Sequence, residues 1–200
     1  MACGLNKQTM DTMREDVSRA VAVLRQGGLL LYPTDTIWGL GCDATRPEAV
    51  ERLYALKRRE TSQQMLVLME NTGWLERYVR EVPDMAYQLF EVAVKPLTLV
   101  LPGARNLAPN LTGEDGSVGI RIPQDPFCQE LLRAFRKPIV STSANLHGMP
   151  SARVYSEVSP EILEGVDYAA EWRREETVSH AAPSSVIKLG TDGTVVIVRP

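Results

Sequence analysis

Residues 29–41 read LLLYPTDTIWGLG, an apolar run that passes directly into a polar motif rich in threonine and glycine. The apolar part, Leu29 to Tyr32, is typical of a short strand buried in a sheet. If the chain stays extended beyond it, Thr34 and Thr36 project to the same side. Their hydroxyls then bind one ligand or bond to neighbouring backbone. The alternative is a strand followed only by a glycine turn.

Helices are predicted on both sides of this strand. Apolar residues recur at helical spacing before and after it: Val17, Ala20, Val21 and Leu24, then Ala49, Leu53 and Leu56. Further strands are predicted at 65–69, 97–101, 118–122 and 139–143, helices near 74–78, 85–90 and 125–135 and after Ser159, and a closing hairpin at 185–189 and 194–198. This alternation favours a single α/β domain with a mixed sheet.

Composition excludes several classes of protein. The 200 residues carry a formal net charge of −3, which argues against a protein that coats nucleic acid by bulk charge. A local basic patch stays open. No stretch approaches the ~20 apolar residues of a membrane span. Cys3, Cys42 and Cys128 lack metal-ligand spacing, so they are expected to be small buried residues of a protein from the reducing cytoplasm.

Three consecutive cations, Lys57, Arg58 and Arg59, end the second predicted helix. Cations at a helix C-terminus complement the helix dipole, which is explanation enough for one or two of them. If the helix ends between Lys57 and Arg59, both side chains can reach one polyphosphate. The pattern therefore leaves a dipole role and a phosphate site open.

A buried strand is predicted to carry Arg121. Ser117, Gly119 and Arg121 share one face of the run SVGIRIP. An arginine inside a domain needs a partner, because an unpaired buried charge is very costly. That partner is a carboxylate either of the protein or of a ligand.

The run IVSTSAN at 139–145 concentrates polar groups at the end of a buried strand. Ser141 and Ser143 share one face. Each buried hydroxyl needs a hydrogen-bond partner, since an unsatisfied one costs about 1–3 kcal/mol. A polar ligand supplies such partners, and a helix-capping turn is the alternative.

Other nucleotide and hydrolase motifs are missing from the sequence. Neither G-x-x-x-x-G-K-[ST] nor G-x-G-x-x-G occurs, so a nucleotide would be held by side chains and scattered amides. His147 lies too close to Ser143 for an ordinary serine triad, and no nucleophile elbow is present. With His180 as the only other histidine, a zinc site is not expected.

Seven motifs in this order resemble the YrdC family. They are PTDTIWGLG (33–41), KRR (57–59), PLTLVL (96–101), VGIRIP (118–123), STSAN (141–145), PSS (183–185) and RP (199–200). The resemblance runs from about residue 15 to the C-terminus, which suggests an N-terminal extension at 1–14 and a YrdC-like domain at 15–200. It implies a twisted mixed sheet with flanking helices and a deep concave cleft.

The family likeness also implies a reaction. L-threonine, bicarbonate and ATP would become threonylcarbamoyl-adenylate and pyrophosphate, for t⁶A modification of tRNA. By motif, Thr36, Arg121, Ser141 and Ser184 would bind threonine. ATP would be bound by Lys57, Arg59, Gln63, Ser117, Ser143, Asn145, Ser151 and Arg199. No covalent nucleophile is implied, Lys57 and Arg59 would act by positioning, and Mg²⁺ would be held mainly by phosphates and water rather than by protein ligands.

One segment departs from the family pattern. The family usually has prolines after K-x-R, whereas residues 60–64 read ETSQQ, which puts Glu60 beside the expected phosphate cations. This departure keeps an alternative open: a YciO-like protein that binds double-stranded RNA or tRNA and has weak or no synthase activity. The family likeness also implies downstream t⁶A-transfer proteins as partners. Association with a membrane is not expected.

Overall fold

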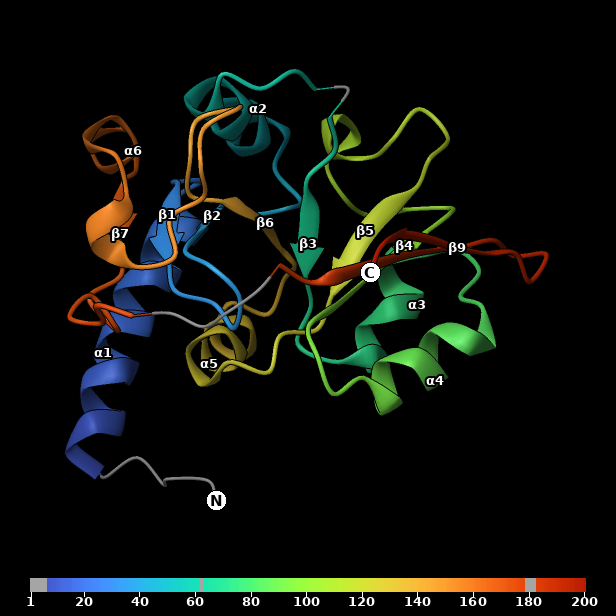
Figure 1. The fold of residues 1–200 in the computed structure, drawn as a ribbon, viewed down its shortest axis with the longest axis horizontal. Coiled ribbons are helices and arrows are strands. Elements are labelled where there is room, and N and C mark those ends of the chain that lie inside the picture. Colours follow the sequence, from blue (N-terminus) through green and yellow to red (C-terminus); the bar gives the residue numbers. More distant parts are fainter. Residues whose placement is uncertain (1–6, 62, 179–182) are drawn as a thin grey trace.

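The computed structural model describes residues 7–61, 63–178 and 183–200. One twisted sheet forms the centre of the described chain, in the order β7-β1-β2-β6-β3-β5-β4-β8-β9 (Figure 1). The strands are β1 (Leu30–Tyr32), β2 (Gly39–Gly41), β3 (Leu66–Leu68), β4 (Leu97–Leu101), β5 (Val118–Arg121), β6 (Ile139–Ser143), β7 (Tyr168–Ala169), β8 (Ser185–Leu189) and β9 (Val195–Arg199). The pairs β1/β7, β3/β5 and β4/β8 are parallel and the others antiparallel, which confirms the predicted mixed sheet.

Helices flank this sheet. They are α1 (Lys7–Arg25), α2 (Pro47–Lys57), α3 (Leu75–Tyr78), α4 (Asp84–Val92), α5 (Pro126–Phe135) and α6 (Pro160–Gly165). Short 3₁₀ turns lie at Thr72–Trp74, Pro109–Leu111 and Tyr155–Glu157. The helix α1 crosses the expected domain boundary at residue 15, and the division into 1–14 and 15–200 stays a prediction. None of the described helices has the length and apolar character needed to cross a bilayer.

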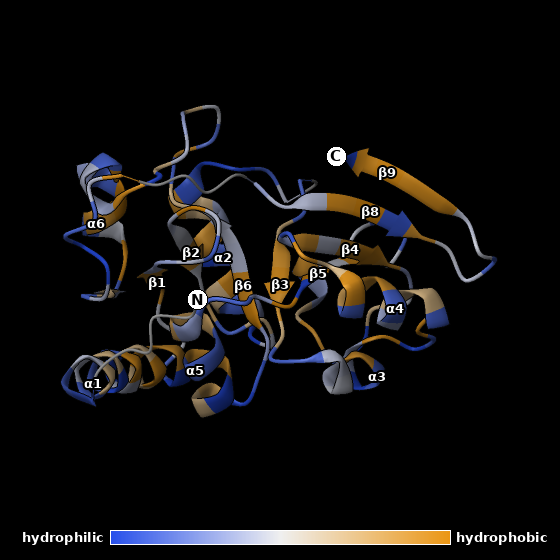
Figure 2. Ribbon diagram, turned by 60° about the horizontal axis from the view of Figure 1, so that its bottom comes forward, coloured by the Kyte–Doolittle hydropathy of each residue, from blue (hydrophilic) through white to orange (hydrophobic). Residues whose placement is uncertain are grey.

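Alternating side chains divide the interior into two clusters. Leu30 and Tyr32 of β1 pack with apolar residues of α1 and α5, whereas Leu31 packs into a larger cluster with α2. Figure 2 shows hydrophobic residues along the central strand β3 and also along the edge strand β9, where Val195–Val198 are exposed. Cys42 and Cys128 are buried free thiols, as expected, whereas Cys3 and His180 lie outside the described residues.

Local sequence signals account for several element ends. Asp125 caps α5 by accepting a hydrogen bond from the Cys128 amide at 3.0 Å, and Pro126 occupies the first turn. The helix α2 starts at Pro47 and ends at Lys57, because Arg58 takes the left-handed conformation with φ of 51°. The helix therefore ends between Lys57 and Arg59.

Two strands, β2 and β7, were not predicted. The segment Gly39–Gly41 is a strand between β1 and β6, not the glycine turn considered as an alternative. A Cβ on Gly41 would lie 2.4 Å from the Val140 carbonyl oxygen, so only glycine permits this approach of two strands. The two-residue strand β7 pairs with β1 from 138 residues further along the chain, and no local pattern marks it.

Candidate functional site

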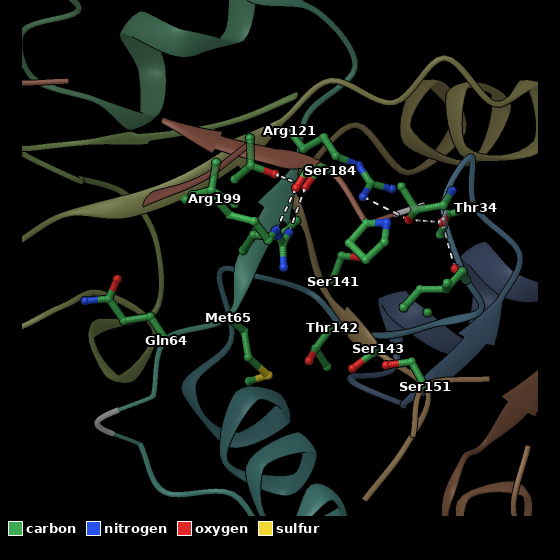
Figure 3. Close-up of a pocket in the computed structure, with 18 of the residues that line it drawn as sticks. Thr34, Gln64, Met65, Arg121, Ser141, Thr142, Ser143, Ser151, Ser184 and Arg199 are labelled. Carbon is green, nitrogen blue, oxygen red and sulfur yellow. Dashed lines mark hydrogen bonds between the residues drawn. The ribbon is translucent and has the colours of Figure 1, made fainter. Parts of the chain in front are cut away.

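A cavity of about 390 Å³ is lined by the segment that follows β1 and by residues of β2, β3, β4, β5, β6, β8 and β9. Figure 3 shows Ser141, Thr142, Ser143 and Ser151 along one side of it, with Arg121, Ser184 and Arg199 on another. Eight of the twelve predicted site residues line this cavity: Thr36, Arg59, Arg121, Ser141, Ser143, Ser151, Ser184 and Arg199. Segments far apart in the sequence therefore meet at one site.

Arg121 lies at the centre of a hydrogen-bonded network and is only 4% exposed. Its Nη2 contacts a carboxylate oxygen of Asp35 at 2.7 Å, and its Nη1 donates to Thr36 Oγ1 at 3.1 Å. The sequence left open whether the partner of this arginine belongs to the protein or to a ligand. The structure supplies a protein partner, Asp35, within the PTDT motif itself.

That pairing does not use all the donors of Arg121. Its Nε is buried, and within the described part of the chain it has no hydrogen-bond partner. A buried guanidinium donor without an acceptor is unusual in a folded protein. Arg121 lines the cavity, and its guanidinium has more N–H groups than its bonds to Asp35 and Thr36 use, so acceptor oxygens of a ligand can pair with it.

Hydroxyl groups form a second part of the lining. Ser141 and Ser184 are buried, and Ser184 Oγ lies 2.8 Å from Thr98 Oγ1. Thr98 also lines the cavity but was not predicted as a site residue. The available signal was a threonine within the apolar strand PLTLVL. Ser143 is partly exposed to the cavity, one residue beyond Thr142.

The charge of the cavity is positive. Among the described residues that line it, Arg59, Arg121 and Arg199 are cationic and none is a carboxylate. Arg59 donates to the carbonyl oxygens of residues 63 and 64 at 2.9 and 2.8 Å, and burial lowers its pKa. Arg199 donates to the Ser184 carbonyl at 2.9 Å. Glu60, the acidic residue next to Arg59 in sequence, is exposed and does not line the cavity.

Lys57 lies behind the cavity, not in its lining. The side chain is 1% exposed, and Nζ donates to the carbonyl oxygens of Ser143 and Asn145 at 2.5 and 2.7 Å. Lys57 thus ties the end of α2 to the segment that follows β6. Because the helix ends at Lys57, the neighbouring cations separate, with Arg59 at the cavity and Arg58 paired with Glu161 at the surface.

Three further predicted residues lie outside the lining. Gln63 contributes a backbone carbonyl to Arg59, and Ser117 is buried with its amide bonded to Asp115. The Asn145 side-chain amide donates to two carbonyl oxygens of its own loop, at 3.0 and 2.5 Å. Gln63 thus bonds to a residue of the lining, whereas these bonds of Ser117 and Asn145 lie within their own segments.

We expect Lys57→Met to lower the free energy of unfolding by about 2–4 kcal/mol, because two buried carbonyl oxygens lose their donor. Urea unfolding measures this change. Lys188→Met is the control: Lys188 pairs with Asp115 in an exposed ion pair, and its loss should cost less than about 0.5 kcal/mol. Equal effects of the two substitutions would contradict a structural role for Lys57.

The wild type and Lys57→Met should also differ in how their stability depends on pH. Burial, with a smaller effect of Arg59, lowers the pKa of Lys57 from 10.5 to about 8. Between these values the unfolded chain holds more protons than the folded chain, so folding becomes more favourable as pH rises. The unfolding free energy of the wild type should therefore increase relative to that of Lys57→Met between about pH 8 and about pH 10. A difference that shrinks over this range would contradict the prediction.

Comparison with known proteins follows the same motifs. Residues 22–200 match the model of the Sua5/YciO/YrdC domain, described as telomere recombination. The chain belongs to this family. Threonylcarbamoyl-AMP synthase from Pseudoalteromonas translucida is 33% identical over 182 residues, which cover 90% of this chain and 95% of the relative. The protein of that name from Stenotrophomonas maltophilia is 41% identical over 152 residues, 74% of this chain and 81% of the relative.

Solved structures of Sua5/YciO/YrdC proteins have the same fold. P. abyssi Sua5 complexed with L-threonine superposes with a TM-score of 0.84 at 28% identity and covers 94% of this chain. The match spans 54% of that longer Sua5 chain. E. coli YciO superposes with a TM-score of 0.78 at 27% identity, covering 93% of this chain and 89% of YciO. These findings confirm the predicted family and fold class.

Proposed function

We propose that this chain is an L-threonylcarbamoyladenylate synthase, which joins L-threonine, bicarbonate and ATP. The observation that carries the proposal is the Arg121 guanidinium, which has N–H groups left over beside the hydroxyl of Thr36, in a cavity lined by three arginines. The synthase name of the curated relatives supports this function over the YciO-like RNA-binding alternative. The sequence match to these relatives spans most of the chain.

The inner part of the cavity suits an amino acid. Arg121 offers guanidinium donors to a carboxylate, the pairing for which its planar fork is best suited. Thr36, Ser141 and Ser184 surround this position with hydroxyl groups. We assign threonine to this part, and the L-threonine bound by P. abyssi Sua5 supports the assignment.

The outer part suits a nucleotide triphosphate. Arg59 and Arg199 supply positive charge, and Ser143 and Ser151 supply hydroxyl donors. Lys57 and Asn145 would act indirectly, by fixing the segment after β6. Among the described residues no three His, Cys, Asp or Glu side chains gather into a metal site. In this proposal Mg²⁺ is held mainly by the phosphate oxygens of ATP and by water, and it offsets phosphate charge.

The proposed reaction needs positioning more than side-chain chemistry. The threonine amine attacks bicarbonate carbon and water leaves, which gives a carbamate. A carbamate oxygen then attacks the α-phosphorus, and the bond from that phosphorus to the bridging oxygen of pyrophosphate breaks. Arg59 and Arg199 stabilise the charge that develops on the phosphates. Arg121 binds the threonine carboxylate and so positions the carbamate for its attack on the α-phosphorus.

Pyrophosphate release tests the proposal. With ATP and bicarbonate present, adding L-threonine should start the release of one pyrophosphate for each threonylcarbamoyl-AMP formed. Chromatography of the nucleotides measures the amount of threonylcarbamoyl-AMP. D-threonine is the control and should give little release. Retention of ATP binding without threonine-dependent release would reject the synthase function. The product would serve t⁶A-transfer proteins that act on tRNA. We place this reaction in the cytoplasm because the three cysteines of the sequence suit a reducing compartment.

A further inference from the structure

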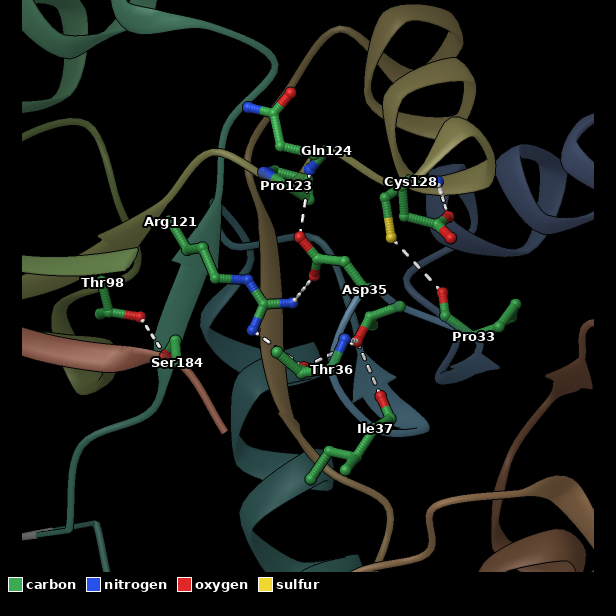
Figure 4. Close-up of polar contacts among 12 residues, drawn as sticks. Pro33, Asp35, Thr36, Ile37, Thr98, Arg121, Pro123, Gln124, Cys128 and Ser184 are labelled. Carbon is green, nitrogen blue, oxygen red and sulfur yellow. Dashed lines mark hydrogen bonds and ion pairs between the residues drawn. The ribbon is translucent and has the colours of Figure 1, made fainter. Parts of the chain in front are cut away.

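Asp35 contacts Arg121 but does not itself line the main cavity. One carboxylate oxygen contacts Arg121 Nη2 at 2.7 Å, and the other accepts the Gln124 amide hydrogen at 3.1 Å (Figure 4). The Asp35 side chain is 15% exposed and borders a separate cavity of about 210 Å³, beside Phe90 and Lys95. It is absent from the lining of the main cavity, so its carboxylate reaches a ligand there only through Arg121.

The bonds beyond Arg121 run in one direction. Thr34 Oγ1 donates to the Ile37 carbonyl oxygen at 2.7 Å, which uses its only hydrogen. Thr34 Oγ1 and Thr36 Oγ1 lie 2.9 Å apart, so Thr36 must be the donor between them. Thr36 Oγ1 in turn accepts from Arg121 Nη1. The order is therefore Arg121 to Thr36 to Thr34 to Ile37.

This order decides what Thr36 can offer a ligand. A hydroxyl has one donor and two acceptor sites. Thr36 uses its donor on Thr34 and one acceptor site on Arg121, so a single acceptor site remains. Arg121 next to it retains donors. The two side chains thus suit a ligand with an N–H or O–H donor adjacent to acceptor oxygens, as in the amine and carboxylate of an α-amino acid.

We infer that Asp35 is a positioning residue for amino-acid recognition, an inference that rests on the proposed function. Its carboxylate fixes the rotation of the Arg121 guanidinium, and the guanidinium donates to Thr36, whose own hydrogen is directed to Thr34 because Thr34 donates to the Ile37 carbonyl. Both Asp35 oxygens accept hydrogen bonds from fixed donors, Arg121 Nη2 and the Gln124 amide. A carboxylate satisfies both, whereas an amide has one acceptor oxygen and would place its NH₂ against a donor.

Asp35→Asn tests the inference, because it keeps the shape and removes the charge and one acceptor. We expect the KM for threonine, and its Kd by calorimetry, to rise about 10–100-fold, while the KM for ATP changes less than about 3-fold. Asp35→Glu retains the charge and both acceptors, and the neighbouring cavity gives room for one methylene. We expect an intermediate rise in the threonine KM, about 3–10-fold.

Asp192→Asn is the matched control, since Asp192 accepts the Thr194 amide in the β8–β9 hairpin away from the cavity. It should leave both KM values unchanged. An unaltered threonine KM in Asp35→Asn, or an equal rise for threonine and ATP with a lower Tm, overturns the inference. If Asp35→Asn does not fold, wild-type values in Asp35→Glu overturn it instead.

Different results would contradict the proposed synthase reaction and the positioning role of Asp35. A wild-type protein that binds threonine but releases no pyrophosphate contradicts the proposed reaction alone, and the threonine Kd of the variants still tests Asp35. Unchanged threonine binding in Asp35→Asn, in an active enzyme, contradicts the positioning role alone. A wild type that does not bind threonine contradicts both.

Discussion

Arg121→Lys is expected to lower kcat/KM for threonine by about 100-fold while the protein stays folded. Lysine keeps a positive charge close to Asp35, so this partly buried carboxylate is not left without a counter-charge. Its ammonium is a single point, however, and cannot serve Asp35, Thr36 and a ligand carboxylate in the planar arrangement that the guanidinium allows. Threonine-dependent pyrophosphate release, with calorimetry for threonine and ATP, measures the effect.

Two comparisons make this result specific. Arg133→Lys makes the same chemical change at a side chain that is 60% exposed, and it should leave kcat/KM unaltered. Arg121→Ala, by contrast, should lower the free energy of unfolding by about 3–5 kcal/mol, because it leaves the Asp35 carboxylate without a counter-charge. A threonine affinity in Arg121→Lys equal to that of the wild type would refute the carboxylate-binding role.

Arg59→Asn is expected to weaken ATP binding by about 10–100-fold, with threonine affinity nearly unchanged. Arg59 is one of three cations in the lining, and it donates to the carbonyl of Gln64, which lies away from Arg121 in Figure 3. Its loss removes charge-assisted donors to phosphate and leaves the Gln64 carbonyl without its 2.8 Å donor. Calorimetric titration with ATP in the presence of Mg²⁺ measures the loss.

The neighbouring arginine provides a matched control. Arg58 has the same side chain but points to the surface, where it pairs with Glu161. Asn tolerates the left-handed conformation of position 58, so Arg58→Asn removes one exposed charge at little backbone cost. ATP affinity should fall less than about 3-fold in this variant. Equal losses in the two variants would show that general charge, not the position of Arg59, attracts the nucleotide.

Most of the fold could be predicted because its signals are local. The strand at 139–143, the helix start at Pro47 and the cap at Asp125 each depend on residues within one or two turns. The strand β2 was missed for the opposite reason. Glycine disfavours strands in general, and only the approach of the Val140 carbonyl explains why glycine is required in this one.

For the site, the sequence by itself determined which residue types gather. Threonines follow β1, an arginine lies on β5 and hydroxyls end β6, and burial alone implies that each needs a partner. Which partner each one has was decided by the tertiary structure, because the contacts join segments far apart: Arg121 bonds to Asp35 across 86 residues, as does Lys57 to Ser143. A cation at a helix end looks the same in sequence whether it lines a cavity or supports its wall. The helix α2 ends at Lys57, and the left-handed turn at Arg58 changes the direction of the chain. Arg59 therefore lies in the cavity lining and Lys57 behind it.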